Sequence, residues 1–121
     1  YSALKQNQKA EQNARKALEL DNTMYQPYRI LSDIYFAKGY EKYENYLQLE
    51  EQAKTAYGQQ ADELVDKRDL AKAAAHDLFL QSDSFLNEAL ARTDNLSEEK
   101  YIKSRKQTLE QLLNATKKDF F

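Results

Sequence analysis

The sequence predicts an all-α protein, a stack of about five antiparallel helices that forms a single domain over residues 1–121. The chain has only 2 glycines and 1 proline, the residues that most often interrupt a helix, which favours long helices with short connections. Apolar residues recur three and four positions apart, and no segment alternates with the period of two expected of a half-buried strand. A chain of this length can bury a working core without metal ions or disulfides.

Two helices are expected before residue 40. The first covers residues 2–20, and the second opens at Asn22 or Thr23, both suitable N-caps, and ends at Gly39. Small side chains on one face of the first helix would let its neighbour approach closely. These small residues are Ala10, Ala14 and Ala17, and the facing ridge on the second helix is Tyr28, Leu31 and Tyr35.

The next two helices are long. The third covers residues 40–66 and contains Gly58, which costs about 1 kcal/mol in a helix interior, so a break there is left open. The fourth covers residues 66–92 or 69–92. Ser82 could cap a new helix, but the apolar residues stay in helical phase across it, which favours continuity.

A fifth helix follows a turn at residues 93–95. Ser97 is its expected N-cap, because a serine hydroxyl can accept a hydrogen bond from an otherwise unpaired backbone N–H. Glu98 and Glu99 then fall in the first turn, where negative charge complements the helix dipole. The apolar face of this helix is expected to continue toward Phe120.

Residues 10–39 carry a regular pattern of small and bulky side chains. After the three alanines, the second helix reads Tyr28-x-x-Leu31-Ser32-x-x-Tyr35-x-x-x-Gly39. This pattern resembles the tetratricopeptide repeat (TPR), from the middle of one repeat to the middle of the next. Asn22 stands where the closing proline is usual, and the register is lost after Gly39. The resemblance implies a helical-repeat scaffold that binds other proteins.

The resemblance also implies where a partner would bind. Ligands of the family usually lie in the groove lined by the first helix of each repeat, and a protein or peptide is the expected ligand. On this chain the corresponding face consists of Gln26, Arg29, Ile30, Asp33 and Phe36. The alternative is that the long third helix or another subunit covers these residues.

The sequence therefore predicts a non-catalytic protein–protein interaction or scaffolding module. The alternative is a structural envelope or coiled-coil-like subunit, whose long Gln-, Glu-, Lys- and Ala-rich helices serve as a spacer or oligomerisation arm. A homo-oligomer is left open: a compact monomer would support the interaction module, and an elongated dimer would support the spacer. There is no cysteine and no glycine-rich phosphate loop, and His76 is the only histidine. No catalytic, cofactor or metal site is therefore expected.

Charge and hydropathy argue against two further classes of partner, nucleic acids and the membrane interior. The net charge of -2 and a pI of about 5.5 lack the basic footprint of a nucleic-acid-binding module. No apolar run approaches the roughly 18 residues of a membrane span. The chain opens at Tyr1 in what reads as mid-helix, so we expect the C-terminal part of a longer protein, with any targeting segment out of view. Cytoplasm and bacterial cell envelope are both left open.

Tyrosine is unusually frequent, with 9 residues. Tyr40, Tyr43 and Tyr46 are spaced three apart and form a stripe along one helix. Such rings can close the boundary of a core while their hydroxyls stay in water, which is the favoured interpretation. They can also anchor a partner protein.

Overall fold

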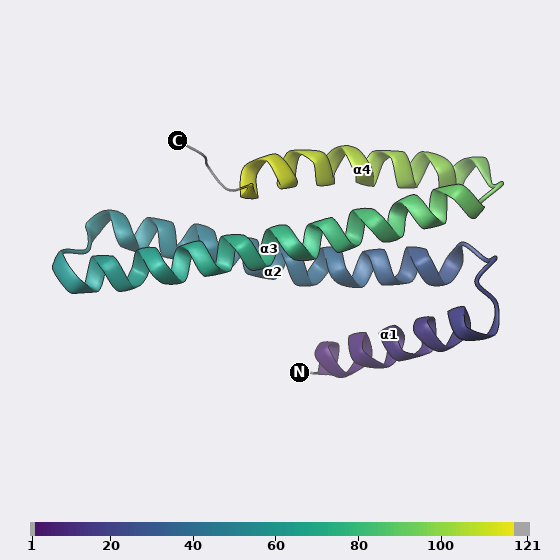
Figure 1. The fold of residues 1–121 in the computed structure, drawn as a ribbon, viewed down its shortest axis with the longest axis horizontal. Helices are drawn as coiled ribbons and strands as arrows, with labels where there is room; N and C mark the ends of the chain where they lie inside the picture. Colours follow the sequence, from purple (N-terminus) through teal and green to yellow (C-terminus); the bar gives the residue numbers. More distant parts are fainter. Residues whose placement is uncertain (1, 118–121) are drawn as a thin grey trace.

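The part of the chain that the structure describes folds into four antiparallel helices. The computed structural model describes residues 2–117, which form α1 (Ser2–Leu20), α2 (Gln26–Thr55), α3 (Gly58–Arg92) and α4 (Leu96–Thr116) (Figure 1). The described residues contain no strand, so the all-α prediction is confirmed, as are the bounds of the first helix. Phe120 lies outside the described residues.

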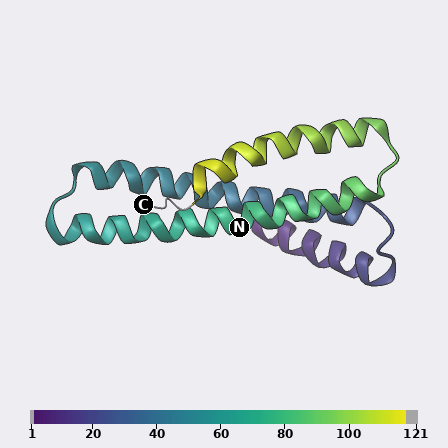
Figure 2. The same cartoon turned by 45° about the horizontal axis from the view of Figure 1, so that its top comes forward.

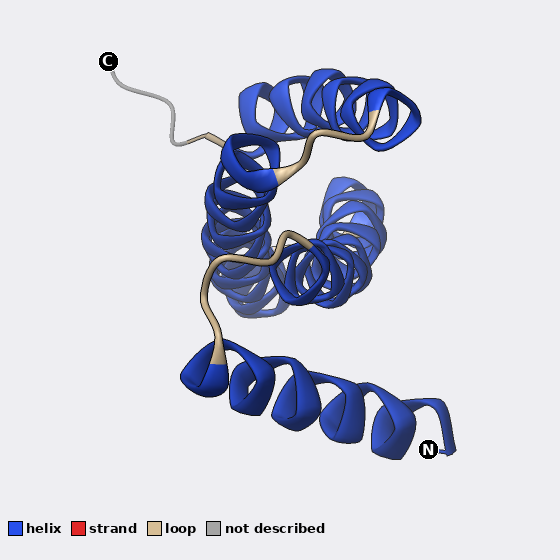
Figure 3. Cartoon of the chain, turned by 90° about the vertical axis from the view of Figure 1, so that its right-hand side faces the viewer, coloured by secondary structure: helices blue, strands red, loops and turns tan. Residues whose placement is uncertain are grey.

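The hairpin of α2 and α3 is the spine of the molecule. The shorter helices α1 and α4 lie on opposite sides of it (Figure 3), and each helix packs chiefly against its neighbours in sequence. Because α1 and α4 flank only one half of the hairpin, its other end projects alone (Figures 1 and 2). We call this projecting part, residues 47–70, the arm.

The prediction of five helices is wrong, and the reason lies in Gly39. The expected second helix does not stop there: α2 continues to Thr55. Gly39 is buried, and a Cβ atom built on it would lie 2.8 Å from the ring atoms Cδ1 and Cε1 of Phe79 and 3.2 Å from Cβ of Leu78. The glycine therefore allows α2 and α3 to approach closely, and it makes no turn.

The break falls instead at Gly58. This residue has φ of +60°, a left-handed conformation that glycine adopts without steric cost. It follows Ala56 and Tyr57, which are extended, and it begins α3. The predicted helix boundary at Asp66 or Asp69 is therefore wrong, whereas the continuity of the helix across Ser82 is confirmed.

The connection between α1 and α2 also differs from the prediction. Neither Asn22 nor Thr23 caps α2, which begins at Gln26 with Pro27 in its first turn. Proline is well suited to that position, where its missing N–H would have no helical partner. The backbone N–H of Thr23 donates to the carboxylate of Asp21 at 2.9 Å, so this segment forms a local turn before the helix starts.

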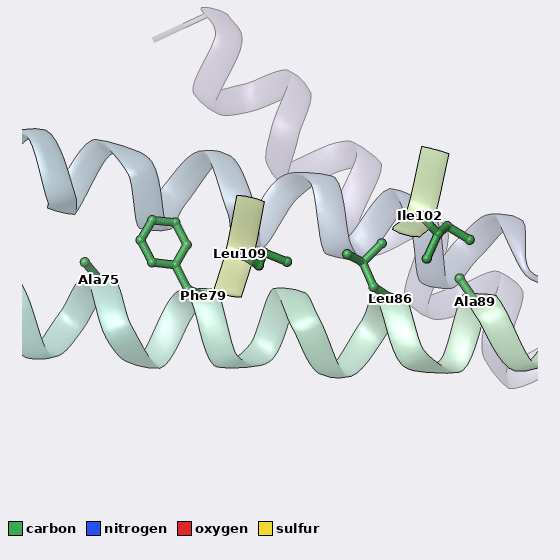
Figure 4. Packing of buried hydrophobic residues seen from close by; sticks show 6 residues of the cluster. All are labelled: Ala75, Phe79, Leu86, Ala89, Ile102 and Leu109. Atoms are coloured by element: carbon green, nitrogen blue, oxygen red, sulfur yellow. The ribbon is translucent and has the colours of Figure 1, made fainter. Parts of the chain in front are cut away.

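The core lies along α3 and is closed by α2 and α4. Six fully buried side chains form it (Figure 4): Ala75, Phe79, Leu86 and Ala89 of α3, with Ile102 and Leu109 of α4. The Phe79 ring lies 5.9 Å from the ring of Phe36 and 6.4 Å from that of Tyr43, centroid to centroid. Tyr46 is buried and Tyr40 is partly exposed, which places the tyrosine stripe at the boundary of the core.

A pair of serines joins α2 to α3 inside this core. Both side chains are fully buried, and the hydroxyl of Ser32 donates to the Ser82 carbonyl at 2.8 Å while the hydroxyl of Ser82 donates to the Ser32 carbonyl at 2.8 Å. Buried polar groups require such partners. Because the two bonds are reciprocal, a shift of one helix along the other would break both, so the pair fixes the register of the hairpin.

The N-cap of α4 lies two residues earlier in the chain than the sequence predicts. The turn at residues 93–95 is confirmed, but Ser97 lies inside the helix and Asn95 is the N-cap. The side-chain oxygen of Asn95 accepts the backbone N–H of Glu98 at 3.2 Å. Glu98 and Glu99 occupy the first turn, as expected from the helix dipole.

Replacing Asn95 by alanine should therefore destabilise the start of α4 by about 1 kcal/mol, since the N–H of Glu98 loses its acceptor. Amide hydrogen exchange in residues 97–101 should speed up before exchange in the rest of the chain. Ser97→Ala is the matched control and should leave this exchange nearly unchanged. The reverse order of effects would place the cap at Ser97.

Polar contacts centred on Glu11 join α1 to α2. Its carboxylate accepts hydrogen bonds from the Tyr35 hydroxyl at 2.9 Å, Lys38 Nζ at 3.0 Å and Arg15 Nε at 3.1 Å. Ala14, one turn further on, is buried, as the predicted close contact requires. Burial alone would raise the pKa of Glu11, but the three donors outweigh it and hold the pKa below the usual value.

Acid should therefore loosen α1. The pKa of Glu11 is lowered by folding, so its contribution is present above the ordinary pKa of glutamate and is lost as the pH falls through the lowered value. At neutral pH Glu11→Gln should cost about 0.2–1 kcal/mol, as for a partly exposed ion pair. Protection factors of α1 amides, which remove the pH dependence of intrinsic exchange, should fall from pH 7 to pH 3, and Glu11→Gln should reduce that fall. An identical pH dependence in both proteins would contradict this role.

Candidate functional site

Five residues are expected to bind a partner. Three of them instead contact α4 of the same chain. The guanidinium of Arg29 pairs with Asp33 at 3.5 Å and with Glu98 at 3.2 Å, and it lies 4.3 Å from the centroid of the Tyr101 ring. The contact with Glu98 is electrostatic, since the two buried atoms lack hydrogen-bond geometry. Burial would lower the pKa of Arg29, but Tyr101 and the two carboxylates together raise it, which keeps the charge in place.

Asp33 and Phe36 complete the contact between α2 and α4. Asp33 accepts hydrogen bonds from the Tyr101 hydroxyl at 3.2 Å and from Arg105 at 3.4 Å. Phe36 packs on Phe79 of α3, and the guanidinium of Arg105 lies 4.1 Å from the centroid of its ring. The structure thus brings Arg29, Asp33 and Phe36 together, but under long side chains of α4.

The remaining members of the predicted set, Gln26 and Ile30, stay at the surface, and Ile30 is 42% exposed. A partner at this face would meet these two residues and the rim of the contact with α4. The binding role of the set stays a prediction.

A second candidate surface was not expected from the sequence. Where α4 ends, a cleft of about 970 Å³ opens over α2 and α3. We call it the distal groove. Its lining residues are Tyr46 and Glu50 of α2, Asp66, Arg68, Asp69, Leu70, Lys72, Ala73, His76 and Asp77 of α3, and Thr116 of α4.

His76 and Thr116 form the end of the groove next to α4. The Thr116 hydroxyl lies 2.7 Å from the Leu112 carbonyl and donates to it, so it accepts from Nδ1 of His76, 3.0 Å away. In this arrangement the imidazole nitrogen acts as a donor to the hydroxyl. A general base would have to accept the proton of that hydroxyl. The pair therefore fastens the end of α4 to α3 and does not activate a nucleophile.

The walls of the groove are mainly acidic. Four carboxylates line it, against the cations Arg68 and Lys72, and Arg68 donates to Asp69 at 3.0 Å. The Tyr46 hydroxyl donates to Glu50 at 2.9 Å, and burial together with this carboxylate raises the pKa of Tyr46. No group of three or more metal-ligating side chains occurs among residues 2–117.

Comparison with known proteins gives no relative for this chain: no protein-family model, no curated protein and no solved structure matches it. The resemblance of residues 10–39 to the TPR therefore stays a prediction. Within the described residues no helix is both long and apolar enough to cross a membrane.

Proposed function

We propose that this chain is a non-catalytic protein-interaction or scaffolding module. The main support is the exposure of two large apolar side chains on the projecting arm. Tyr57 at its tip is 87% exposed and Leu70 in the distal groove is 73% exposed, although both are large apolar side chains. Single exposed apolar residues are common on protein surfaces. Leu70, however, lines the distal groove next to the end of α4, and apolar side chains in a cleft are expected of a binding site.

The arrangement of the helices also supports a scaffolding role. Helices that pack chiefly on their neighbours in sequence are typical of repeat proteins, whose open faces bind partners. The burial of Ala14 against the spine agrees with the TPR-like interpretation. The absence of a turn at Gly39 counts against a second TPR hairpin, so the proposed resemblance is limited to the stacking of α1 on α2.

Site-specific crosslinking tests this function. A photoreactive amino acid placed at Tyr57 or Leu70 in the full chain, in its native cells, should give adducts with another protein. The same probe at Gln12, an exposed residue of α1, is the control. Mass spectrometry of the adduct identifies the crosslinked segment. The proposal is wrong if neither Tyr57 nor Leu70 yields more adduct than the control at Gln12.

The alternative is a spacer or oligomerisation subunit. It is favoured by the length of the spine, since the 35 residues of α3 extend over about 52 Å. The mass in solution separates the two functions. A monomer of 14.2 kDa over a wide concentration range agrees with an interaction module, whereas a stable dimer would support the spacer.

A further inference from the structure

The distal groove continues the surface on which α4 already lies. Along α3, Lys106 of α4 contacts Asn87 and Asp83, and Thr116 contacts His76. Further toward the start of α3, the residues on the same helical stripe are Ala73, Asp69 and Asp66, which are spaced three and four apart and line the groove. The groove therefore offers a second helix the same face of α3, beyond the end of α4.

The contacts of α4 show what kind of helix this face accepts. Its buried residues Ile102, Leu109 and Thr116 repeat every seven positions, as expected of one helix face. Beside them, Lys106 Nζ pairs with Asp83 at 2.8 Å and Arg105 pairs with Asp33 at 3.4 Å. An amphipathic helix with basic side chains along its apolar edge thus fits the spine.

Charge selects among the possible occupants of the groove. Residues 40–77 hold nine acidic and five basic residues, a net charge of −4, whereas the rest of the chain holds 11 and 13, a net charge of +2. In the part of the chain that the structure describes, neither Asp66 nor Asp77 has an ion-pair partner. Two copies of the segment 40–77 would repel each other, and a basic segment would be attracted.

We propose that the distal groove binds a basic amphipathic helix of a partner protein. This inference rests on the proposed interaction function. Leu70 and Ala73 contact the apolar side of the bound helix, the small side chain of Ala73 allowing a close approach. Asp66, Asp77 and Glu50 pair with its lysine or arginine side chains.

A synthetic helical peptide tests the inference. The probe has about four turns, leucines at the seven-residue spacing of α4 and lysines beside them. A second peptide has glutamates in place of the lysines. In a fluorescence anisotropy titration the basic peptide should bind at least about tenfold more tightly than the acidic one. Amide chemical shifts should change around Tyr46, Leu70 and His76.

Two variants locate the binding. Asp66→Lys combined with Asp77→Lys should lower the affinity for the basic peptide by about tenfold or more. The matched control combines Glu41→Lys with Glu44→Lys, exposed residues of α2 that do not line the groove, and should change binding much less. Leu70→Ser, at an exposed position, should weaken binding while the melting midpoint stays the same.

Three results would overturn the proposal. One is failure of the basic peptide to bind more tightly than the acidic one, and another is equal binding to both charge-reversed variants. The third is a dimer that Leu70→Ser dissociates, which would place a second copy in the groove. Adducts from Tyr57 in cells, together with failure of the peptide, would reject the groove and leave the interaction function standing.

Discussion

Replacing Phe79 by alanine should lower the free energy of unfolding by about 3–5 kcal/mol. Phe79 is fully buried and lies where the three helices of the core meet: its ring faces Gly39, Phe36 and Tyr43 of α2. Removing it leaves a cavity that two rigid, register-locked helices can close only in part. The effect should appear in urea unfolding followed by circular dichroism.

The neighbouring residue provides the control for this prediction. Leu80 is a large apolar side chain on the same helix, but it is 47% exposed. Leu80→Ala should cost well under half as much as Phe79→Ala, since it removes much less buried area. Equal losses for the two variants would contradict the placement of Phe79 at the centre of the core.

Gly39→Ala should destabilise the protein by about 1–3 kcal/mol, although alanine is the better helix former by about 1 kcal/mol. The added Cβ would lie 2.8 Å from the Phe79 ring, which is itself fixed by Phe36 and Tyr43. Either the ring must leave its position or α2 and α3 must separate. An increase in stability, which helix propensity alone predicts, would show that the close contact does not exist.

A second substitution tests the cause of this loss. In a Phe79→Leu background the clash is smaller, so Gly39→Ala should cost less there than in the parent protein. Gly58→Ala is the comparison, because no atom lies within 4 Å of the added Cβ and only its φ of +60° opposes alanine. Its cost should be the same in both backgrounds.

The two glycines explain why the helix count could not be predicted. Sequence pattern identifies glycine as a possible helix end, but it does not distinguish a chain reversal from a close contact between helices. The role of Gly39 is determined by its contact with Phe79, 40 residues away in the chain. The role of Gly58 is determined by its own left-handed backbone conformation. The all-helical class depended on periodicity along the whole chain, which explains why that prediction is confirmed.

The candidate sites show the same division between local and distant information. The TPR resemblance placed Arg29, Asp33 and Phe36 on one face of a helix, in line with their spacing, and the structure brings the three together. The coverage of that face by Tyr101 and Arg105 could not be foreseen, because it depends on where α4 packs.

The distal groove was missed for the corresponding reason. Its residues Asp66, Leu70, Ala73 and Asp77 have helical spacing that is visible in the sequence. They read as an ordinary solvated face, because the groove depends on how α2, α3 and the end of α4 pack together, which the spacing along one helix does not show.

Small-angle X-ray scattering of the chain in solution tests whether an open helical spine projects beyond α1 and α4 and leaves the distal groove exposed. A compact domain of 121 residues would have a radius of gyration of about 14 Å. We expect a monomer with a radius of gyration clearly above that value and a maximum dimension of at least about 52 Å, the length of α3. A monomer with a radius of about 14 Å would contradict the account, because the arm would then be folded against the other helices and the distal groove closed.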